Sequence, residues 1–389
     1  MRKVLFVGDA ACQSGFARCT HAAAWAFHNT EWEVHVLGIN YMGEPHFYPY
    51  NIYPAYNPHE GGEDRWGLGR LKVLNDKIKP DLVVLLTDPW NVKGYMNMLG
   101  QSKHEPKTVG WLAVDAKNQR GFECTDLDHI VTWTEFGRTE LLVSGAPGDP
   151  AVIPLGYDHN TFFKSDKASA REEMFPMIDE DDFLVGYVGR NQTRKRLDLT
   201  IEYFADWVNR FRIDNAKLYL HVAPTGDNSF GLADLIIYHG MRGKVLIMNS
   251  EIGDGMNDIQ MRQMYNSLDL FFTTTQGEGW GLPEMEAMAC GVPVLAPAWS
   301  GLGDWAKDAA CLVACDGTVA SAPEGQGAYT LGGLMGKAKT IEMLNGLYID
   351  KEWRDRQAER GFYFVQDPKF HWENIGQAFF DEVTRKCQL

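Results

Sequence analysis

The sequence predicts an α/β protein built from two domains with parallel sheets. Its 389 residues exceed the size at which one hydrophobic core usually stops growing. Short apolar runs typical of buried strands recur along the chain, at residues 3–8, 32–37, 81–86, 108–114, 183–190, 217–222, 244–248 and 268–274. Finally, glycines and prolines in residues 276–297 indicate a loop, a short helix and a strand that directly follow the last of these runs. This succession is typical of a crossover in an α/β domain.

Composition narrows the functional classes. No apolar run is long enough to span a bilayer, and the N-terminus is expected to be a strand rather than a signal peptide. The seven cysteines are scattered, and Cys311 and Cys315 lack a second pair for a zinc site, so we expect reduced thiols and a cytoplasmic location. A net charge of −15 argues against broad binding to polyanions or anionic membranes, although it allows a local basic patch.

The first domain opens with a strand at Lys3–Gly8 and a glycine-containing loop. Ser14 is expected to cap a helix that runs from about Gly15 to Ala26. The loop is neither a Walker A motif nor a G-x-G-x-x-G motif, which argues against a nucleoside triphosphatase and a nicotinamide-dependent enzyme.

An aromatic loop from Tyr41 to Tyr56 follows the second strand. Its prolines argue against regular pairing. The loop is either a binding platform, since aromatic faces stack on sugars or bases, or a simply packed loop. Tyr48 and Tyr50 are the candidate residues.

Asp88 and Asp115 follow the next two strands. Ligands of open α/β sheets bind beyond the carboxyl ends of strands, so these aspartates are also candidate binding residues. Asp126-Leu-Asp128 resembles a metal-binding D-x-D motif, but it precedes a strand instead of ending one, and we discount it.

The second domain is expected to begin near Asp158, after a hinge marked by Pro154 and Gly156. A basic cluster then separates the strand at residues 183–190 from an amphipathic helix. The cluster consists of Arg190, Arg194, Lys195 and Arg196. Because the helix dipole disfavours basic residues at a helix start, the cluster indicates a site for an anion such as a diphosphate.

Residues 276–297 carry two carboxylates, Glu278 in the glycine loop and Glu286 on the expected first helical turn. The helix N-terminus offers unpaired N–H groups to a phosphate or polar ligand, and the glycines allow close approach to the backbone. Carboxylates at such a turn would repel a phosphate, so they are better suited to accept hydrogen bonds from sugar hydroxyls. Either glutamate alone is more simply explained as a solvated residue, but the whole segment is not.

This segment resembles the E-x7-E signature of family 4 retaining glycosyltransferases, and the likeness extends over nearly the whole chain. The resemblance implies the GT-B fold, in which two Rossmann-like domains with parallel sheets face each other across a cleft. It further implies an N-terminal acceptor-binding domain (1–157), a nucleotide-sugar-binding domain (158–366), and a C-terminal helix (367–389) that crosses back to the first domain.

The resemblance also implies roles for individual residues. Glu278 would face the transferred sugar, and Glu286 would hold the ribose hydroxyls. The backbone at Gly281 and Leu282 would contact the sugar and the distal phosphate, and Gly15 would lie close to the donor phosphates. Arg190 and Lys195 would stabilise the leaving diphosphate, although the lysine's place could also be taken by Arg194 or Arg196. The nucleotide base would lie beside residues 249–253.

The implied function is retaining transfer of a sugar from a nucleoside diphosphate sugar to a hydroxyl acceptor. The sugar donor is a co-substrate, and neither a cofactor nor a metal is implied. A glycan or small hydroxylated molecule is the expected acceptor, ahead of a hydroxymethylated DNA base. Its candidate contacts, on the acceptor side in the first domain, are Asp88, Asp115, Tyr48 and Tyr50. Nucleic acid would need a basic patch, for which the first domain offers Lys103, Lys107, Lys117, Arg120 and Arg138. A Rossmann oxidoreductase and a non-catalytic GT-B-like binding or scaffold protein are the alternatives of other classes. The oxidoreductase ranks low because its glycine motif is missing.

Overall fold

The computed structural model describes the chain except for residues 13, 56–63, 65, 223–229, 248–254 and 322–329. It contains two compact units. The first unit consists of Met1–Gly156 together with Lys369–Leu389, and the second of Tyr157–Pro368.

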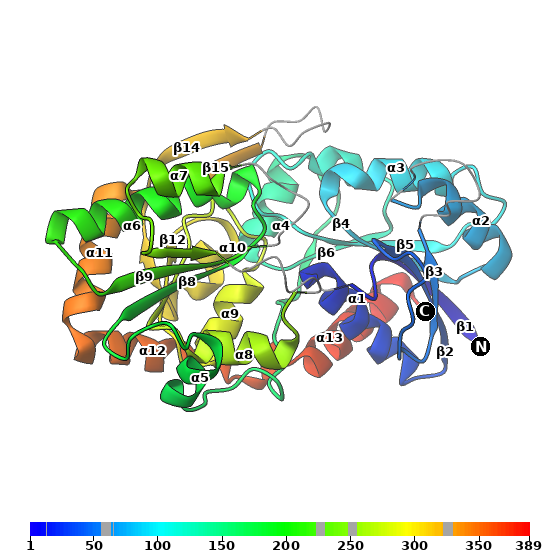
Figure 1. Cartoon of the computed structure of the whole chain (residues 1–389). Coiled ribbons are helices and arrows are strands. Elements are labelled where there is room, and N and C mark those ends of the chain that lie inside the picture. Colours follow the sequence, from blue (N-terminus) through cyan, green and yellow to red (C-terminus); the bar gives the residue numbers. More distant parts are fainter. Residues whose placement is uncertain (13, 56–63, 65, 223–229, 248–254, 322–329) are drawn as a thin grey trace. The chain divides into compact units, whose positions relative to one another are not determined.

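The first unit is built on a seven-stranded sheet in which every pairing is parallel. In sheet order its strands are β3 (Asn51–Pro54), β2 (Trp32–Ile39), β1 (Arg2–Asp9), β4 (Leu82–Thr87), β5 (Lys107–Leu112), β6 (His129–Thr132) and β7 (Ala151–Val152) (Figure 1). The helices are α1 (Gly15–His28), α2 (Leu68–Ile78), α3 (Pro89–Leu99), η1 (Gly121–Cys124), α4 (Glu135–Val143) and α13 (Trp372–Cys387).

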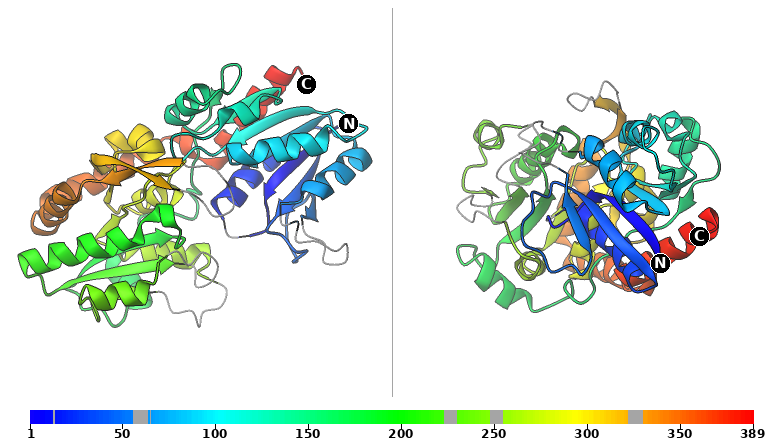
Figure 2. Two further views of the ribbon diagram at one scale, coloured as in Figure 1. Left: turned by 90° about the horizontal axis from the view of Figure 1, so that it is seen from above. Right: turned by 90° about the vertical axis from the view of Figure 1, so that its right-hand side faces the viewer.

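Helices cover both faces of this sheet (Figures 1 and 2). On one face, buried residues of α2 and α3 share a hydrophobic cluster with alternate residues of the central strands. On the other face, Phe27 of α1 packs edge-on against Phe6, and Phe379 of α13 stacks on Trp111 at 4.4 Å between ring centroids. Burial of both faces explains why the strands of a parallel sheet are continuous apolar runs.

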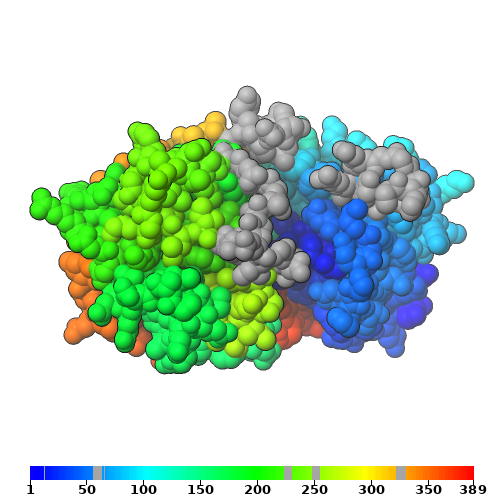
Figure 3. Space-filling view, viewed as in Figure 1, coloured from blue at the N-terminus to red at the C-terminus, as the bar shows by residue number. Residues whose placement is uncertain are grey.

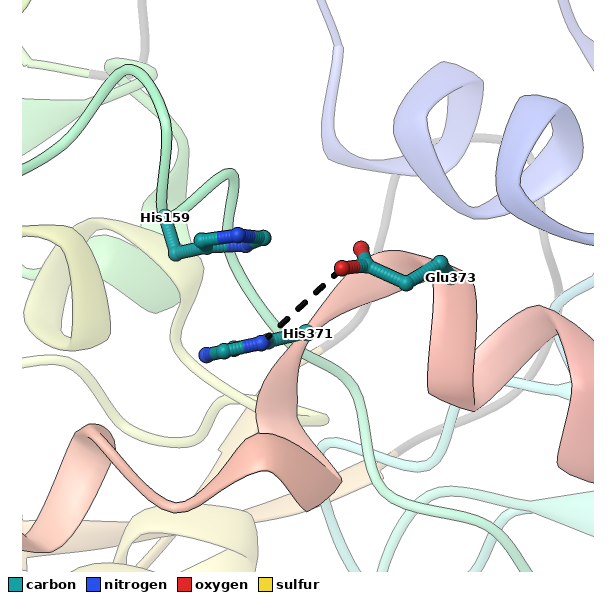
Figure 4. Close-up of side chains that lie close together, drawn as sticks. All are labelled: His159, His371 and Glu373. Atoms are coloured by element: carbon teal, nitrogen blue, oxygen red, sulfur yellow. Dashed lines mark ion pairs between the residues drawn. The ribbon is translucent and has the colours of Figure 1, made fainter.

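The C-terminal helix α13 packs against α1 of the first unit, in agreement with the resemblance, which implies that this helix crosses back to the first domain. His371 precedes the helix, and its imidazole lies 3.9 Å from the carboxylate of Glu373 (Figure 4). Further along, the imidazole Nε2 of His129 on β6 lies 3.0 Å from Glu382. At Gly376 a Cβ would come within 2.3 Å of the carbonyl oxygen of Ala22, so a glycine is needed for the two helices to approach this closely.

The second unit contains a six-stranded parallel sheet and a two-stranded antiparallel sheet. In sheet order the parallel strands are β10 (Val245–Ile247), β9 (Ala216–Val222), β8 (Phe183–Gly189), β11 (Leu270–Phe272), β12 (Val294–Pro297) and β13 (Cys311–Val313), and the antiparallel pair is β14 (Cys315–Ser321) and β15 (Thr330–Met335). The helices are α5 (Lys167–Met174), η2 (Thr193–Lys195), α6 (Leu197–Phe211), α7 (Leu232–Tyr238), α8 (Asp258–Asn266), α9 (Leu282–Ala289), α10 (Ser300–Trp305), η3 (Ala306–Asp308), α11 (Lys337–Ile349) and α12 (Lys351–Val365), and η4 (Pro368–Phe370) leads into α13.

Helices α11 and α12, coloured orange, pack against each other and lie at the lower left of the second unit in Figure 1, and orange atoms are visible on the same side in Figure 3. None of the described helices in either unit has the length and hydropathy needed to span a membrane.

Both parallel sheets have a Rossmann-type strand order. The sequence of strands β3-β2-β1-β4-β5-β6 in the first unit corresponds to β10-β9-β8-β11-β12-β13 in the second. In such a sheet the chain turns in opposite directions from the two central strands, and ligands bind at the carboxyl ends of that pair. In the second unit the basic cluster follows β8 and the glycine loop follows β11. The strand order therefore brings the two predicted donor-binding segments to the same edge of the sheet.

One local expectation about the aromatic loop was wrong. We expected its prolines to prevent regular pairing, but Asn51–Pro54 forms β3 and pairs with β2. The strand lies at the edge of the sheet with Pro54 as its last residue, a position where a missing backbone N–H is tolerated.

Candidate donor site and the residues of the first unit

A buried ion pair joins the basic cluster to the glycine loop. The Nζ of Lys195, at the end of η2, lies 2.5 Å from Oε1 of Glu278. Arg194 donates to the carbonyl oxygen of Gly277 at 2.9 Å and to Oε2 of Glu278 at 3.2 Å. Lys195 and Glu278 are only 8% and 7% exposed. Burial alone would raise the pKa of Glu278, but the charges of Lys195 and Arg194 hold it at about 2. Glu278 is therefore ionised at neutral pH.

The other arginines of the basic cluster are arranged differently. Arg196, directly before α6, donates to both carboxylate oxygens of Asp198 at 2.9 and 2.7 Å. Arg190 follows β8 and is exposed. Protein carboxylates thus balance much of the charge at the start of α6, which weakens the argument that only an anion could explain it. Because Arg196 is paired with Asp198, Lys195 is the better candidate for the basic residue that the resemblance places beside the diphosphate.

The glycine loop ends at Gly281, which has a φ of +99° and immediately precedes α9. A side chain there would be strained, and a Cβ would lie 2.7 Å from Leu302. The helix begins at Leu282, so Pro283 is its second residue rather than its first. Glu286 consequently lies beyond the first turn, and the acidic residue of that turn is Glu284. Our placement of Glu286 on the first turn was wrong because the helix starts before its proline.

Glu286 has its own partner in the second unit. The hydroxyl of Tyr265, on α8, donates to Oε2 of Glu286 at 3.0 Å, and both side chains are buried. The structure therefore holds Glu278 and Glu286 through different neighbours. Holding one oxygen in place would orient the carboxylate as a rigid acceptor for ligand hydroxyls.

Sequence reasoning missed Glu284, a third carboxyl group in the same segment. Glu284 is 3% exposed, and its Oε2 is buried without a hydrogen-bond partner in the described part of the chain. A Cβ at Gly281 would lie 2.8 Å from this oxygen. Burial, and then the negative charge of Glu278, raise the pKa of Glu284 to about 8. The available signal was an acidic residue between Pro283 and Met285 in an otherwise apolar helix start.

The opposite pKa shifts of Glu284 and Glu278 predict how stability depends on pH. A raised pKa means that Glu284 binds its proton more tightly in the folded chain. Its contribution to the free energy of unfolding is therefore fully present below pH 4.5 and is lost as the pH rises to 8. Glu278 has a lowered pKa, so its contribution is present above pH 4.5 and lost towards pH 2. The free energy of unfolding of the wild type, measured by chemical denaturation, should therefore include a fall on the order of 2–4 kcal/mol between pH 5 and 8 that is due to Glu284. We expect this fall to be absent in Glu284→Gln.

The exposed Glu172 on α5 supplies the control, since Glu172→Gln should keep the wild-type dependence. An equal fall in the free energy of unfolding for wild type and Glu284→Gln would contradict the prediction.

The acceptor-side aspartates follow adjacent strands of the first unit. Asp88 immediately follows β4 and precedes α3, and Asp115 lies three residues beyond the end of β5. Both are partly buried, and Asp115 accepts a hydrogen bond from the side chain of Gln119 at 2.9 Å. Gly15 is the exposed first residue of α1, which Ser14 caps as expected by accepting from the N–H of Ala17.

The aromatic candidates lie against α1. Tyr48 is partly buried and stacks on His21, with ring centroids 3.5 Å apart and an interplanar angle of 10°. The backbone N–H of Ala11 donates to His21 Nε2 at 3.4 Å, so Nδ1 carries the proton that is donated to the hydroxyl of Tyr50 at 2.6 Å. Tyr50 is only 6% exposed, whereas Phe47 is fully exposed. Tyr50 is therefore a packing residue, and Tyr48 is the better candidate for a binding surface.

Two further predictions concern the Asp126-Leu-Asp128 motif and the location of the nucleotide base. Asp128 accepts from the backbone N–H and the hydroxyl of Thr108 at 2.8 and 3.0 Å, and from Lys107 at 2.8 Å, at the amino ends of β5 and β6. These hydrogen bonds give Asp128 a structural role, which is consistent with our decision not to interpret Asp126-Leu-Asp128 as a metal-binding motif. The predicted location of the nucleotide base, residues 249–253, lies outside the described residues.

Comparison with known proteins identifies the fold as GT-B. The structure matches sucrose-phosphate synthase from Thermosynechococcus elongatus with a TM-score of 0.74, 17% identity and 99% of both chains covered. It matches the Anabaena protein HepE in complex with UDP and glucose with a TM-score of 0.73, 16% identity, and 99% and 100% of the two chains covered. The predicted fold class is confirmed.

Residues 170–324 match the family model of glycosyl transferases group 1. This confirms the resemblance drawn from the sequence. A D-inositol 3-phosphate glycosyltransferase of Mycobacteroides abscessus is 30% identical over 183 residues, which are 46% of this chain and 38% of the relative. The corresponding enzyme of Gordonia bronchialis is 27% identical over 272 residues, which are 68% of this chain and 53% of the relative. The chain thus spans about half, or less, of the length of these relatives.

Proposed function

We propose that the chain is a retaining glycosyltransferase that moves a sugar from a nucleoside diphosphate sugar to a hydroxyl acceptor. The observation that carries the proposal is the buried pair of Lys195 and Glu278. It joins the segments after β8 and β11, at the strand ends where a sheet of this order binds ligands. The pair lies within the matched glycosyl transferase domain, and the names of the relatives support the class.

Each donor-side residue has a distinct task in this proposal. Arg190, Lys195 and the N–H groups at the start of α9, near Gly281 and Leu282, stabilise the charge that develops on the leaving diphosphate. Glu278 orients the transferred sugar. The departing phosphate oxygen takes the proton of the acceptor hydroxyl as the new glycosidic bond forms, so the mechanism needs no separate base. A complex of HepE with UDP-glucose supports a uridine nucleotide as the first donor to test.

A small hydroxylated molecule or a glycan is the proposed acceptor. Acidic partners surround most of the basic residues that a nucleic-acid surface would need. The pairs are Lys107 with Asp128, Lys117 with Glu140, Arg120 with Glu123, and Arg138 with Glu135 and Asp149. Positive charge that is balanced in this way gives little phosphate binding. The relatives named for D-inositol 3-phosphate also favour a hydroxylated small molecule over a hydroxymethylated DNA base. A cytoplasmic location is part of the proposal, and seven unpaired cysteines support it.

Mass spectrometry of donor hydrolysis tests the proposed class. The protein is incubated with UDP-, GDP- and ADP-sugars, and release of the free sugar is followed. One donor should be hydrolysed slowly without an acceptor, and faster once a suitable polyol is added. Absence of binding and hydrolysis across the panel would favour a non-catalytic GT-B-like binding or scaffold protein.

The proposed ribose contact gives a separate prediction. If Glu286 accepts hydrogen bonds from the ribose hydroxyls, a 2′-deoxy donor should bind the native protein about 1–2 kcal/mol less tightly. Glu286→Ala should lose most of this discrimination, measured as the ratio of the two dissociation constants. Tyr265→Phe, which removes the hydroxyl that orients Glu286, should reduce the discrimination in part. Equal discrimination in wild type and Glu286→Ala would remove Glu286 from the ribose site.

A further inference from the structure

Glu284 occupies the first turn of α9, at the centre of a cluster of titratable groups. The titratable groups that influence it come from several elements. They are Glu278 from the glycine loop, Glu286 from α9 itself, Lys195 from η2, Tyr187 from β8 and Tyr265 from α8. Three carboxyl groups thus share this region with one buried lysine and the side chain of Arg194.

The possible partners of Glu284 are engaged elsewhere or do not reach it. Lys195 and Arg194 bond to Glu278, at 2.5 and 3.2 Å, and the hydroxyl of Tyr265 bonds to Glu286. Among the described residues no donor satisfies Oε2 of Glu284. The charge of Lys195 and the backbone N–H of Glu284 favour the ionised form, but no ion pair with Glu284 is formed among the described residues, and the desolvation of a buried carboxylate is strongly unfavourable. The raised pKa of Glu284, to about 8, agrees with this geometry.

A carboxyl group in this position needs an explanation beyond packing. An apolar side chain of similar size would fill the space without leaving a buried oxygen unpaired. The position matters electrostatically because Lys195 carries the charge that the proposed donor site directs at a diphosphate. With Glu278 ionised, a further negative charge on Glu284 would compete for Lys195 and repel the ligand.

We propose that Glu284 is a positioning residue of the donor site, a carboxyl group held neutral so that Lys195 stays paired with Glu278 and available to a nucleoside diphosphate. Glu284 acts through Lys195 rather than by contact with the donor. This inference rests on the proposed function, since it requires a nucleoside diphosphate as ligand.

The test is the pH dependence of nucleoside diphosphate binding. UDP, GDP and ADP are titrated into the full chain by calorimetry between pH 6.5 and 9. For the nucleotide that binds best, wild-type affinity should fall roughly tenfold between pH 7 and 9, as Glu284 ionises. Glu284→Gln, which stays neutral, should lack most of this fall, whereas Glu172→Gln should keep it. Titration of the nucleotide itself is common to all three proteins and cancels in the comparison.

The outcomes separate the inference from the proposed function. A fall of equal size in wild type and Glu284→Gln, or a flat wild-type profile, overturns the role of Glu284 and leaves the donor site standing. A nucleotide affinity that rises with pH would show that ionised Glu284 favours binding, by accepting a hydrogen bond from a ligand hydroxyl, which also overturns the inference. Failure of all three nucleotides to bind at any pH overturns the proposed function together with it. Should Glu284→Gln not fold, Glu284→Met provides the neutral side chain, and a flat wild-type profile remains decisive by itself.

Discussion

Replacing Lys195 with alanine should lower kcat/KM for donor hydrolysis by roughly 30-fold to 1,000-fold, which corresponds to about 2–4 kcal/mol of transition-state stabilisation. The physical reason is that Lys195 supplies the buried positive charge of the candidate donor site, held 2.5 Å from Glu278. Initial rates of sugar release, measured over a range of donor concentrations, should show a higher apparent donor constant together with a lower turnover.

Loss of stability has to be separated from loss of catalysis in this variant. Removing one partner of a buried ion pair typically destabilises a protein by about 3–5 kcal/mol, and the remaining contact of Arg194 with Glu278 should reduce that figure. Lys195→Met combined with Glu278→Gln removes both charges, and should recover stability without recovering activity. Arg196→Ala is the neighbouring control, because Arg196 pairs with Asp198 and should have a much smaller effect on hydrolysis. Full activity of both Lys195→Ala and Arg190→Ala would show that the diphosphate site is misplaced.

Local signals in the sequence were sufficient for much of the fold. The parallel strands are buried on both faces and therefore appear as continuous apolar runs. Ser14 has the cap geometry expected of a serine before a helix. Strand order is a different matter, since it depends on contacts between residues distant in the chain. The pairing of β8 with β11, across 80 residues or more, became known only from the structure. Edge strand β3 was missed because a proline-rich aromatic segment carries no alternation that would indicate it.

In the candidate site, too, some features have a local signal in the sequence and others depend on contacts between distant residues. Lys195 and Glu278 were each recognisable from their motifs, but their direct ion pair links segments 83 residues apart and has no local signal. Glu284 was overlooked because its significance comes from two properties of the folded site: its Oε2 has no hydrogen-bond partner within the described ranges of the chain, and the charge of Glu278 lies nearby. The exact start of α9 also mattered, since a shift of one residue decided which carboxylate lies on its first turn.

Replacing Tyr48 with serine should reduce sugar transfer to the acceptor by roughly a hundredfold while slow donor hydrolysis continues. Tyr48 is only partly buried and is held flat against His21, 3.5 Å away between ring centroids. A ring fixed in this way offers a rigid apolar face on which a sugar or polyol can stack. Loss of the ring should misplace the acceptor without disturbing Lys195, Glu278 and Glu286, which belong to the second unit. Transfer and hydrolysis are measured in the same reaction, as glycosylated product and as free sugar.

Two control variants separate the effect of the Tyr48 ring on transfer from effects on stability and from the loss of a tyrosine elsewhere. Tyr50→Phe removes only the hydroxyl that accepts from His21, and should lower stability by about 0.5–1.5 kcal/mol with little effect on the ratio of transfer to hydrolysis. Tyr363→Ser changes a 70% exposed tyrosine on α12 and should leave both rates unaltered. If Tyr48→Ser transfers sugar as well as wild type, the aromatic segment is a packed loop and acceptor recognition lies elsewhere. Tight binding of duplex DNA with a steep salt dependence would reverse the order of the acceptors, because phosphate contacts would then dominate recognition despite the acidic partners of the basic residues.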